Sequence, residues 1–292
     1  MDKLIVGIGE ILWDMLPEGK KLGGAPANFA YHAGQSGLSS CVVSAIGNDN
    51  AGQEILEQLK MKKLNYSIGQ NDYPTGSVSV HLDEKGIPCY DILRQVAWDN
   101  IVYSPELEEI AARTNAVCFG TLAQRNEVSH ATINRFLDRM PDGDKQYKIF
   151  DINLRQDFYT QEILTQSLRR CNILKMNDEE LMIIRNMFGY KQTDTQTVCN
   201  ALRSDYDLEI LILTCGVNGS YVFNSDGNSF YETPRIQVRD TVGAGDSFTA
   251  TFCAALLKKR DLREAHRLAV EVSAYVCTQD GAMPPLPDHL KY

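Results

Sequence analysis

Residues 240–248 are Asp240-Thr241-Val242-Gly243-Ala244-Gly245-Asp246-Ser247-Phe248, and an apolar run over 249–257 follows them directly. Two glycines that flank one alanine let the backbone turn sharply and present successive N–H groups outward. The apolar run predicts a helix, whose dipole adds about half a positive charge at the same place. We therefore expect an anion site at the start of this helix, suited to a phosphoryl group during its transfer.

Asp246 falls in the first turn of the expected helix, beside the anion site. A carboxylate there is placed to take the proton from an attacking hydroxyl. The alternative is purely structural: a glycine turn followed by an acidic residue that stabilises a helix N-terminus. These nine residues alone leave both interpretations open.

Outward from this stretch, short apolar runs alternate with longer amphipathic ones, which is typical of an α/β protein. The expected strands are 4–8, 41–46, 116–119, 148–152, 172–176 and 210–214. The expected helices are 26–34, 52–60, 128–140, 180–188, 196–202, 246–257 and 263–276. Most of the strands are followed directly by Gly or Asn, as is typical of buried parallel strands with turns at their carboxyl ends.

One segment departs from this alternation. Residues 75–82 and 87–93 alternate polar with apolar side chains and flank the turn-rich link Asp83-Glu84-Lys85-Gly86, which predicts a β-hairpin. A hairpin inserted into an α/β core often forms a lid or an oligomer contact, because its second face needs cover. An edge hairpin lying on the same domain remains the alternative.

Composition and charge exclude several classes of protein. The 292 residues are 43% hydrophobic, which excludes wholesale disorder, and 29 basic against 38 acidic residues give a net charge of −9. That balance argues against a nucleic-acid surface, although it permits an anionic substrate held by local cations and amides. No run reaches the roughly 18–20 apolar residues of a membrane helix, and no signal-peptide pattern or zinc spacing of the cysteines is present, so we expect a cytoplasmic protein.

A second motif is Gly23-Gly24-Ala25-Pro26-Ala27-Asn28-Phe29-Ala30. The glycine pair allows a ligand close to the backbone, and Pro26 suits a first helical turn. The amide of Asn28 offers a donor and an acceptor, which suits neighbouring sugar hydroxyls. A helix start that happens to contain an asparagine explains the motif equally well.

A third motif is Asn177-Asp178-Glu179-Glu180, directly after an expected strand. The spacing of Asn177 and Glu180 is that of a capping box. At the carboxyl end of a central strand the same two residues are also placed to order magnesium and its waters near triphosphate oxygens. Both interpretations can hold together.

A fourth motif, Leu213-Thr214-Cys215-Gly216-Val217-Asn218-Gly219-Ser220, leads from one strand into the next through two glycines. Close approach of the backbone would suit a nucleotide phosphate or ribose, and a plain glycine hairpin is the alternative. The phosphate-binding Gly-x-x-x-x-Gly-Lys-Ser/Thr pattern, the protein-kinase motifs and the third glycine of the dinucleotide fingerprint are all absent, which disfavours those enzymes.

Taken in order, these motifs resemble those of the PfkB (ribokinase-like) family of carbohydrate kinases, from Gly7 to Pro285. Within the family the chain is most similar to bacterial fructokinases. The stretches that carry this closer similarity are Gly9-Glu10-Ile11-Leu12-Trp13-Asp14, Leu122-Ala123-Gln124-Arg125 and Asp151-Ile152-Asn153-Leu154-Arg155.

The resemblance implies a three-layer α/β/α sandwich with a mainly parallel central sheet and a small β-sheet lid. It implies a single domain over residues 1–292, with lid elements around 10–24 and 74–102. In relatives the lid often mediates dimerisation, so a homodimer through the lid is also an expectation.

The resemblance also gives roles to individual residues. It makes Asp246 the catalytic base and Gly243, Ala244 and Gly245 the anion hole, which also contacts the nucleotide. The implied sugar-binding residues are Asp14, Gly24, Asn28, Gln124 and Arg155. The implied nucleotide-binding residues are Asn177, Thr214, Gly216 and Gly219. Glu180 and Asn177 are implied to bind Mg²⁺ through water, and Asp240 is implied to bind a monovalent cation such as K⁺.

The expected activity is ATP-dependent phosphorylation of a sugar at its primary hydroxyl, with fructose as substrate and fructose 6-phosphate as product. ATP and Mg²⁺ are the expected cofactors, with no nucleic-acid or membrane partner. One alternative is the same fold acting on ribose, a nucleoside, tagatose or 2-keto-3-deoxygluconate. The other alternative is a non-catalytic sugar-binding relative.

Overall fold

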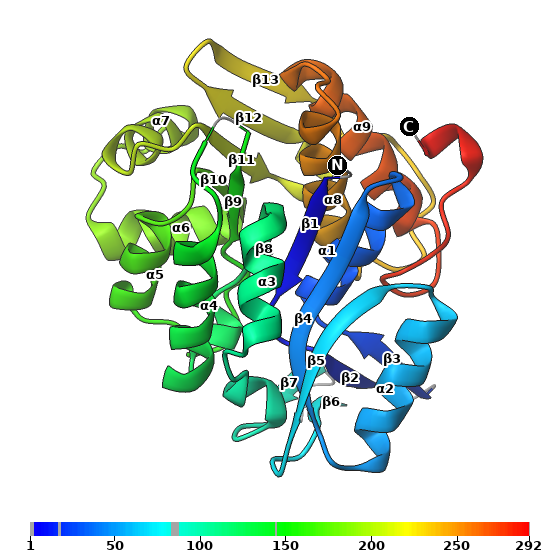
Figure 1. Ribbon diagram of the computed structural model, residues 1–292. Helices are drawn as coiled ribbons and strands as arrows, with labels where there is room; N and C mark the ends of the chain where they lie inside the picture. The colour runs from blue at the N-terminus through cyan, green and yellow to red at the C-terminus, as the bar shows by residue number, and fades with distance from the viewer. Residues whose placement is uncertain (1–2, 17–18, 83–87, 144, 292) are drawn as a thin grey trace.

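The computed structural model describes residues 3–16, 19–82, 88–143 and 145–291. Figure 1 shows a large twisted sheet enclosed by helices, with a smaller sheet beneath it. The predicted turn Asp83-Glu84-Lys85-Gly86 lies outside the described residues. Within the described ranges, every helix is too short or too polar to cross a bilayer.

The large sheet is built mainly from parallel strands, as predicted. Its members are β1 (Leu4–Ile8), β4 (Ser39–Gly47), β5 (Asn65–Asn71), β8 (Thr114–Phe119), β9 (Tyr147–Asp151), β10 (Ile173–Asn177), β11 (Ile210–Thr214), β12 (Ser220–Asn224) and β13 (Gly227–Tyr231). They lie in the order β13-β12-β11-β10-β9-β8-β1-β4-β5. Neighbours from β11 to β5 run parallel, whereas β12 is antiparallel to β11 and to β13.

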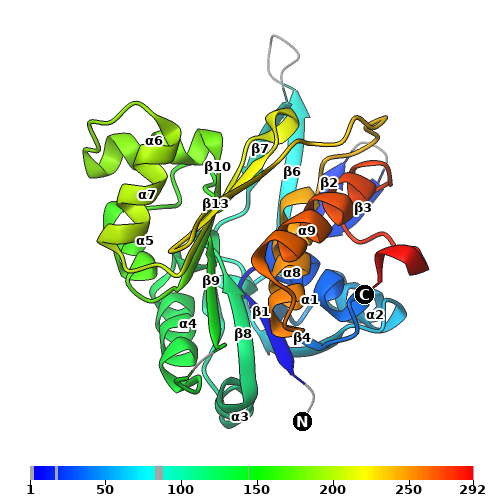
Figure 2. The same ribbon diagram turned by 90° about the horizontal axis from the view of Figure 1, so that it is seen from above.

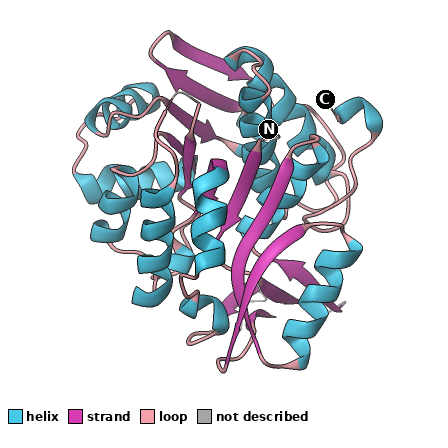
Figure 3. Cartoon of the chain, in the orientation of Figure 1, coloured by secondary structure: helices cyan, strands magenta, loops and turns pink. Residues whose placement is uncertain are grey.

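Helices cover both faces of this sheet, which gives the three layers that the sequence predicts (Figure 3). They are α1 (Ala25–Gln35), α2 (Asn50–Met61), α3 (Pro105–Arg113), α4 (Glu127–Arg139), α5 (Gln161–Leu168), α6 (Asp178–Phe188), α7 (Thr195–Asp205), α8 (Ala244–Leu257) and α9 (Leu262–Cys277). Figure 2 shows α3 to α7 on one face and α1, α8 and α9 on the other.

Alternation along the strands creates a separate core on each face of the sheet. In β1, Ile5 packs with Phe29 of α1 and Phe252 of α8, whereas its neighbour Val6 packs in the core that contains Phe136 of α4. All five side chains are at most 1% exposed. Because both faces are covered, these strands are continuous apolar runs, and apolar runs of this kind are what identified them in the sequence.

The small sheet joins two segments that are far apart in the chain. It contains β2 (Leu12–Leu16), β3 (Gly19–Gly23), β6 (Gly76–Leu82) and β7 (Pro88–Ile92) in the order β3-β2-β6-β7. The predicted antiparallel pairing of the hairpin strands β6 and β7 is confirmed. In Figure 1 this sheet lies below the carboxyl ends of the parallel strands, the edge at which α/β proteins bind their ligands.

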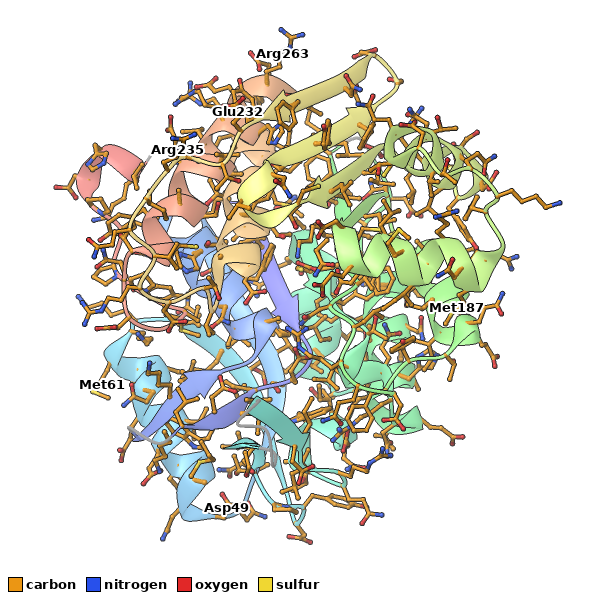
Figure 4. All side chains as sticks on the ribbon, turned by 180° about the vertical axis from the view of Figure 1, so that it is seen from behind. Asp49, Met61, Met187, Glu232, Arg235 and Arg263 are labelled. Atoms are coloured by element: carbon orange, nitrogen blue, oxygen red, sulfur yellow. The ribbon has the colours of Figure 1, made fainter. Side chains whose placement is uncertain are left out.

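Asp49 fixes the point where the chain enters β6. Its carboxylate accepts from the backbone N–H of Gly52, which caps α2, and also from both the N–H and the hydroxyl of Thr75. The Thr75 hydroxyl in turn accepts from the N–H of Gly47 at 3.0 Å. Figure 4 shows Asp49 at the lower end of the molecule, beside the small sheet. The start of β6 is therefore tied to the large sheet, while the rest of the small sheet projects from it.

Candidate active site

The order of strands in the large sheet reverses at β1. The chain continues from β1 through β2, β3 and α1 to β4 on one side of β1, and β8 lies on the other side of β1. A small cavity opens here, at the carboxyl ends of β1, β8 and β9. Its lining residues are Glu10, Ala25, Pro26, Phe29, Cys118, Phe119, Gly120, Asp151, Asn153 and Asp246. Asp246, proposed from the sequence as a base, therefore faces the cavity.

The first turn of α8 forms a cradle of backbone amides from Gly243, Ala244 and Gly245. Gly243 is the N-cap with φ of 78°, and a Cβ on it would come within 2.7 Å of Ala282. At Gly245 the constraint is different, because a Cβ there would lie 3.0 Å from Nζ of Lys175. Gly243 is thus required by its backbone conformation and by Ala282, whereas a side chain at 245 would press on the Lys175 ammonium. The N–H of Ala244 donates to the carbonyl of Thr241 at 3.3 Å, so in this turn the N–H groups of Gly243 and Gly245 are those left for an anion.

Asp246 is half-buried and held by one side chain of α1. Nδ2 of Asn28 donates to Oδ2 of Asp246 at 2.7 Å. Burial, and then the nearby negative charge of Asp151, raise the pKa of Asp246 to about 6. The Asn28 hydrogen bond, Lys175 and Arg155 act in the opposite direction. At neutral pH the carboxylate is therefore ionised and able to accept a proton.

The other residues expected to bind sugar lie around the mouth of this site, with one exception. Asp14, on β2 of the small sheet, faces the charge of Arg155, and burial raises its pKa to about 6. Gly24 is the N-cap of α1, with φ of 114°. Arg155 is exposed, and its charge acts on both Asp14 and Asp246. The fold thus gathers residues from both sheets around Asp246.

Gln124 is the exception. Its side chain is 2% exposed, and its amide donates to the carbonyl of Gly120 and the hydroxyl of Ser167. The amide oxygen lies 3.1 Å from Nδ1 of His130. Both the nitrogen and the oxygen of the Gln124 amide therefore have partners inside the protein. The structure does not bring this side chain together with the other predicted sugar-binding residues.

The Asn177 and Glu180 side chains form the predicted capping box at the start of α6. Oε2 of Glu180 accepts from the N–H of Asn177, and Oδ1 of Asn177 accepts from the N–H of Glu180. The second carboxylate oxygen of Glu180 accepts from the N–H of Leu154 at 2.9 Å. Glu180 therefore also ties α6 to the loop that carries Arg155.

A divalent cation would not find a ready-made cage of side chains. Among the described residues no group of three or more His, Cys, Asp and Glu could hold a metal ion. The buried oxygens of Glu180 already accept from two N–H groups, which leaves lone pairs only for ordered waters. This donor set fits Mg²⁺ that takes most of its ligands from phosphate oxygens and water.

The motif expected at the nucleotide lies next to this box, because Thr214 pairs with Asn177 across β10 and β11. Gly216 begins a short 3₁₀ turn and Gly219 ends it, after which β12 returns antiparallel. A glycine hairpin is therefore what the structure contains. It lies beside the capping box, after the carboxyl end of β11.

Asp240 links two loops that are distant in the chain. Its carboxylate accepts from the N–H groups of Val242 and Gly281, and Nζ of Lys21 lies 3.8 Å away. The loop at Asp240, where the resemblance implies a monovalent cation, therefore lies against the loop that contains Gly281. Because the side-chain oxygens of Asp240 already have partners, cation ligands here would come from backbone carbonyls.

A buried ion pair lies beneath the cradle and was not predicted. Nζ of Lys175 is 3.0 Å from Oδ1 of Asp151, and the hydroxyl of Thr249 on α8 donates to the other carboxylate oxygen. Both charged residues are less than 9% exposed. A lysine inside the apolar run Ile173-Leu174-Lys175-Met176 is a detectable signal, because a buried charge needs a partner.

Two further residues, Asn153 and Glu10, line the cavity. Both lie in the stretches that resemble fructokinases, but the resemblance implies no function for either side chain. Asn153 has φ of 46°, a conformation that non-glycine residues adopt mainly where surrounding structure imposes it, and often at functional sites. Glu10 follows β1 and is 3% exposed. Neither property is visible in the sequence.

Comparison with known proteins covers almost the whole chain. The model of the pfkB family of carbohydrate kinases matches residues 18–289. An ATP-dependent 6-phosphofructokinase of Thermoanaerobacterium thermosaccharolyticum is 28% identical, over 97% of this chain and 91% of the relative. A fructokinase of Salmonella typhimurium is also 28% identical, over 96% and 95% of the two chains.

The fold has solved counterparts. The crystal structure of an uncharacterized sugar kinase from Pyrococcus horikoshii superposes with a TM-score of 0.82 at 26% identity, covering 99% of this chain and 96% of the other. Its layers and sheets correspond to those described above, which confirms the fold class predicted from the sequence.

Proposed function

This chain belongs to the pfkB family of carbohydrate kinases and is a sugar kinase, and on that premise we propose that it phosphorylates fructose. The γ-phosphoryl group of ATP would pass to the primary hydroxyl of the ketohexose and give fructose 6-phosphate. The fructokinase name of a 28% identical relative supports this sugar, and the ATP-bound form of the Pyrococcus horikoshii kinase supports the nucleotide.

One observation carries the proposal. Asp246, three residues into α8, is ionised at neutral pH and stands directly beside the amides of Gly243, Ala244 and Gly245. Transfer of a phosphoryl group to a hydroxyl needs these two elements together, a proton acceptor and fixed partial positive charge.

In the proposed reaction Asp14, Gly24 and Asn28 hold the sugar so that its primary hydroxyl points at Asp246, and Arg155 faces the transferred phosphate. The hydroxyl loses its proton to Asp246 as the new O–P bond forms and the bond to ADP breaks. Because the hydroxyl becomes acidic only in the transition state, Asp246 needs correct placement more than a strongly raised pKa.

The proposed nucleotide site runs from the cradle past Asn177 to Thr214, Gly216 and Gly219. Mg²⁺ bound with ATP would neutralise phosphate charge, and Asn177 and Glu180 would order its waters. We place a potassium ion between the loop at Asp240 and residues 278–281, on backbone carbonyls. Closure of the small sheet as a lid would exclude water from the transferred group.

The testing experiment is a panel of acceptors in an assay that couples ADP release to a spectroscopic change. Fructose, ribose, tagatose, 2-keto-3-deoxygluconate, nucleosides and, because of the phosphofructokinase relative, fructose 6-phosphate are compared by kcat/KM. We expect fructose to have the highest value by at least tenfold. A higher value for another acceptor overturns fructose but keeps the kinase, whereas binding of fructose without ADP release favours a non-catalytic relative.

Homodimerisation through the small sheet also remains a proposal. Met15 on β2 is 44% exposed, so this sheet leaves apolar surface uncovered in the single chain. Sedimentation equilibrium of the wild type and of Met15→Glu tests this: weaker association in the variant supports the small-sheet contact.

A further inference from the structure

Glu10 is a buried carboxylate that the reaction proposed above does not use. It directly follows Gly9 at the end of β1, lines the same cavity as Asp246 and is 3% exposed. The backbone N–H groups of Glu10 and of Ala25, the first residue of α1, act on this carboxylate and lower its pKa. Part of the hydrogen-bonding capacity of the carboxylate is thus satisfied by backbone N–H groups, one of them at the start of α1.

The rest of the hydrogen-bonding capacity of Glu10 has no protein partner. Oε2 of Glu10 is fully buried and receives no hydrogen bond among the described residues, and Oδ1 of Asn28 is in the same state. A buried acceptor without a donor costs about 1–3 kcal/mol. Two such atoms, on residues at the Asp246 site, indicate that a ligand or a bound water brings the missing donors.

We propose that Glu10 is a specificity-determining residue, whose Oε2 accepts a hydrogen bond from a substrate hydroxyl close to the one that is phosphorylated, directly or through one bridging water. The inference rests on the proposed sugar-kinase reaction and deepens it. It defines the substrate class at this end of the site as a carbon skeleton that carries a second hydroxyl beside the reacting one.

The charges around Glu10 exclude an anionic group at this point of the substrate. The carboxylates of Asp246 and Asp151 line the same cavity and repel an anion, and a fully ionised phosphate or carboxylate has no proton to give to Oε2. The charge of Arg155 acts on Glu10 from the exposed loop after β9, while Lys175, beneath the cradle, is already paired with Asp151. A hydroxyl supplies the donor without adding charge.

Burial, with the negative charge of Asp246 as a smaller contribution, raises the pKa of Glu10 to about 7. A carboxylate so close to its neutral form loses little by remaining unpartnered and gains when a hydroxyl binds to its ionised form. This agrees with the geometry, in which a residue that lines the cavity carries one buried oxygen without a donor.

The experiment is a functional-group cycle. The panel above first identifies the best acceptor sugar, whichever it is. The kcat/KM values of that sugar and of its monodeoxy analogues are then measured for the wild type, Glu10→Gln and Glu10→Ala. Binding of the same ligands without ATP is measured by calorimetry. Ser44→Ala is the matched control, because the Ser44 hydroxyl donates to the carbonyl of Gly9, next to Glu10 and outside the cavity.

In the wild type and in Ser44→Ala we expect one analogue, deoxygenated near the reacting carbon, to lose about 10- to 100-fold, the range for a hydrogen bond to a charged group. In Glu10→Ala the same analogue and the parent sugar should differ by less than about threefold. Glu10→Gln should retain part of the discrimination, because its amide oxygen still accepts.

If Glu10→Ala slows the parent sugar and every analogue equally, the residue only caps α1 and the inference is overturned. If no wild-type analogue is discriminated, no hydroxyl meets Glu10 and the inference is again overturned. Failure of the kinase reaction itself appears earlier, as absence of ADP release with every acceptor of the panel.

Discussion

Asn28 and Asp246 are 218 residues apart in the chain, and Nδ2 of Asn28 donates to Oδ2 of Asp246 at 2.7 Å. The bond joins the first turns of α1 and α8, which belong to the two motifs that first suggested a sugar kinase. A residue expected to bind sugar therefore also orients the proposed base. The other oxygen of Asp246 accepts no protein hydrogen bond in the described part of the chain, so it remains available to a substrate hydroxyl.

This bond predicts how activity responds to pH. The base works only when ionised, so kcat/KM should fall at least about tenfold per pH unit below the Asp246 pKa, which is about 6, because Glu10 and Asp14 also become protonated in this range. Asn28 stabilises the ionised form, so Asn28→Ala should move this acid limb upward by about 1 unit, equivalent to about 1.4 kcal/mol. Full pH profiles of both enzymes measure the shift. An unmoved limb with only a raised KM would mean that Asn28 contacts sugar alone.

Asp246→Asn tests the base directly. The amide keeps the size of the side chain and an oxygen for Asn28, but it cannot take up the proton. Turnover should fall by about 10²–10⁴-fold, the usual contribution of a positioned general base. The dissociation constant of the sugar, measured by calorimetry without ATP, should change by less than about threefold. Near-normal turnover in this variant would remove Asp246 from the chemistry.

Asp14→Ala should affect binding more than turnover. Asp14 reaches the site from the small sheet, and removing it deletes hydrogen bonds to sugar hydroxyls worth roughly 1–3 kcal/mol, or about 10- to 100-fold in sugar affinity. Asp91, on β7 of the same sheet, is exposed, and Asp91→Ala is the matched control with expected wild-type affinity. Equal affinity for sugar in both variants would place Asp14 outside the site.

Much of the fold could be predicted because its buried strands are continuous apolar runs. The strands β3, β5 and β13 were not predicted, because they lie at sheet edges and lack such runs; β5, for example, is Asn65-Tyr66-Ser67-Ile68-Gly69-Gln70-Asn71. In β2 the apolar run is interrupted by Asp14. The helices α3 and α5, with nine and eight residues, are too short for a clear period. Edge strands and short helices depend on tertiary contacts that a linear pattern does not record.

The site was predictable where a motif fixes the backbone and less so where a side chain can turn either way. The cradle and Asp246 follow from glycines before a helix. The position of Gln124 in the chain is close to the site, but the direction of its side chain could not be predicted. Its amide is hydrogen-bonded to Ser167 and His130 in the interior. The free oxygen of Glu10 depends on what surrounds it in three dimensions, and no sequence pattern encodes that.

The raised carboxyl pKa values also predict how stability changes with pH. Glu10 titrates at about 7 in the folded protein, above its ordinary value, so the folded state binds this proton more tightly and loses stability as pH rises through 7. The buried His32 and His266, with pKa values lowered to about 4, act in the opposite direction, because their unfolded forms still release protons between pH 6.5 and about 7.5. Between pH 6.5 and 8 Glu10 alone should lower the free energy of unfolding by about 1 kcal/mol, and the two histidines offset most of this fall in the wild type.

Urea unfolding of the wild type and of Glu10→Gln at pH 6.5 and 8 isolates the contribution of Glu10, because the histidines act equally in both proteins. Since the amide does not titrate, the stability of the variant relative to that of the wild type should rise by about 1 kcal/mol between the two pH values. An identical pH response of the two proteins would contradict the assignment of a near-neutral pKa to Glu10.

The last prediction concerns the ion pair beneath the cradle. Lys175→Met leaves the carboxylate of Asp151 buried without its cation, which should cost about 3–5 kcal/mol in the free energy of unfolding. Asp151→Asn leaves the Lys175 ammonium unpaired and should cost a similar amount. The double variant removes both charges, so its cost should be smaller than either single cost, and urea unfolding of all four proteins gives the coupling energy. Additive single costs would show that the two charges do not depend on each other, despite the 3.0 Å between Nζ and Oδ1.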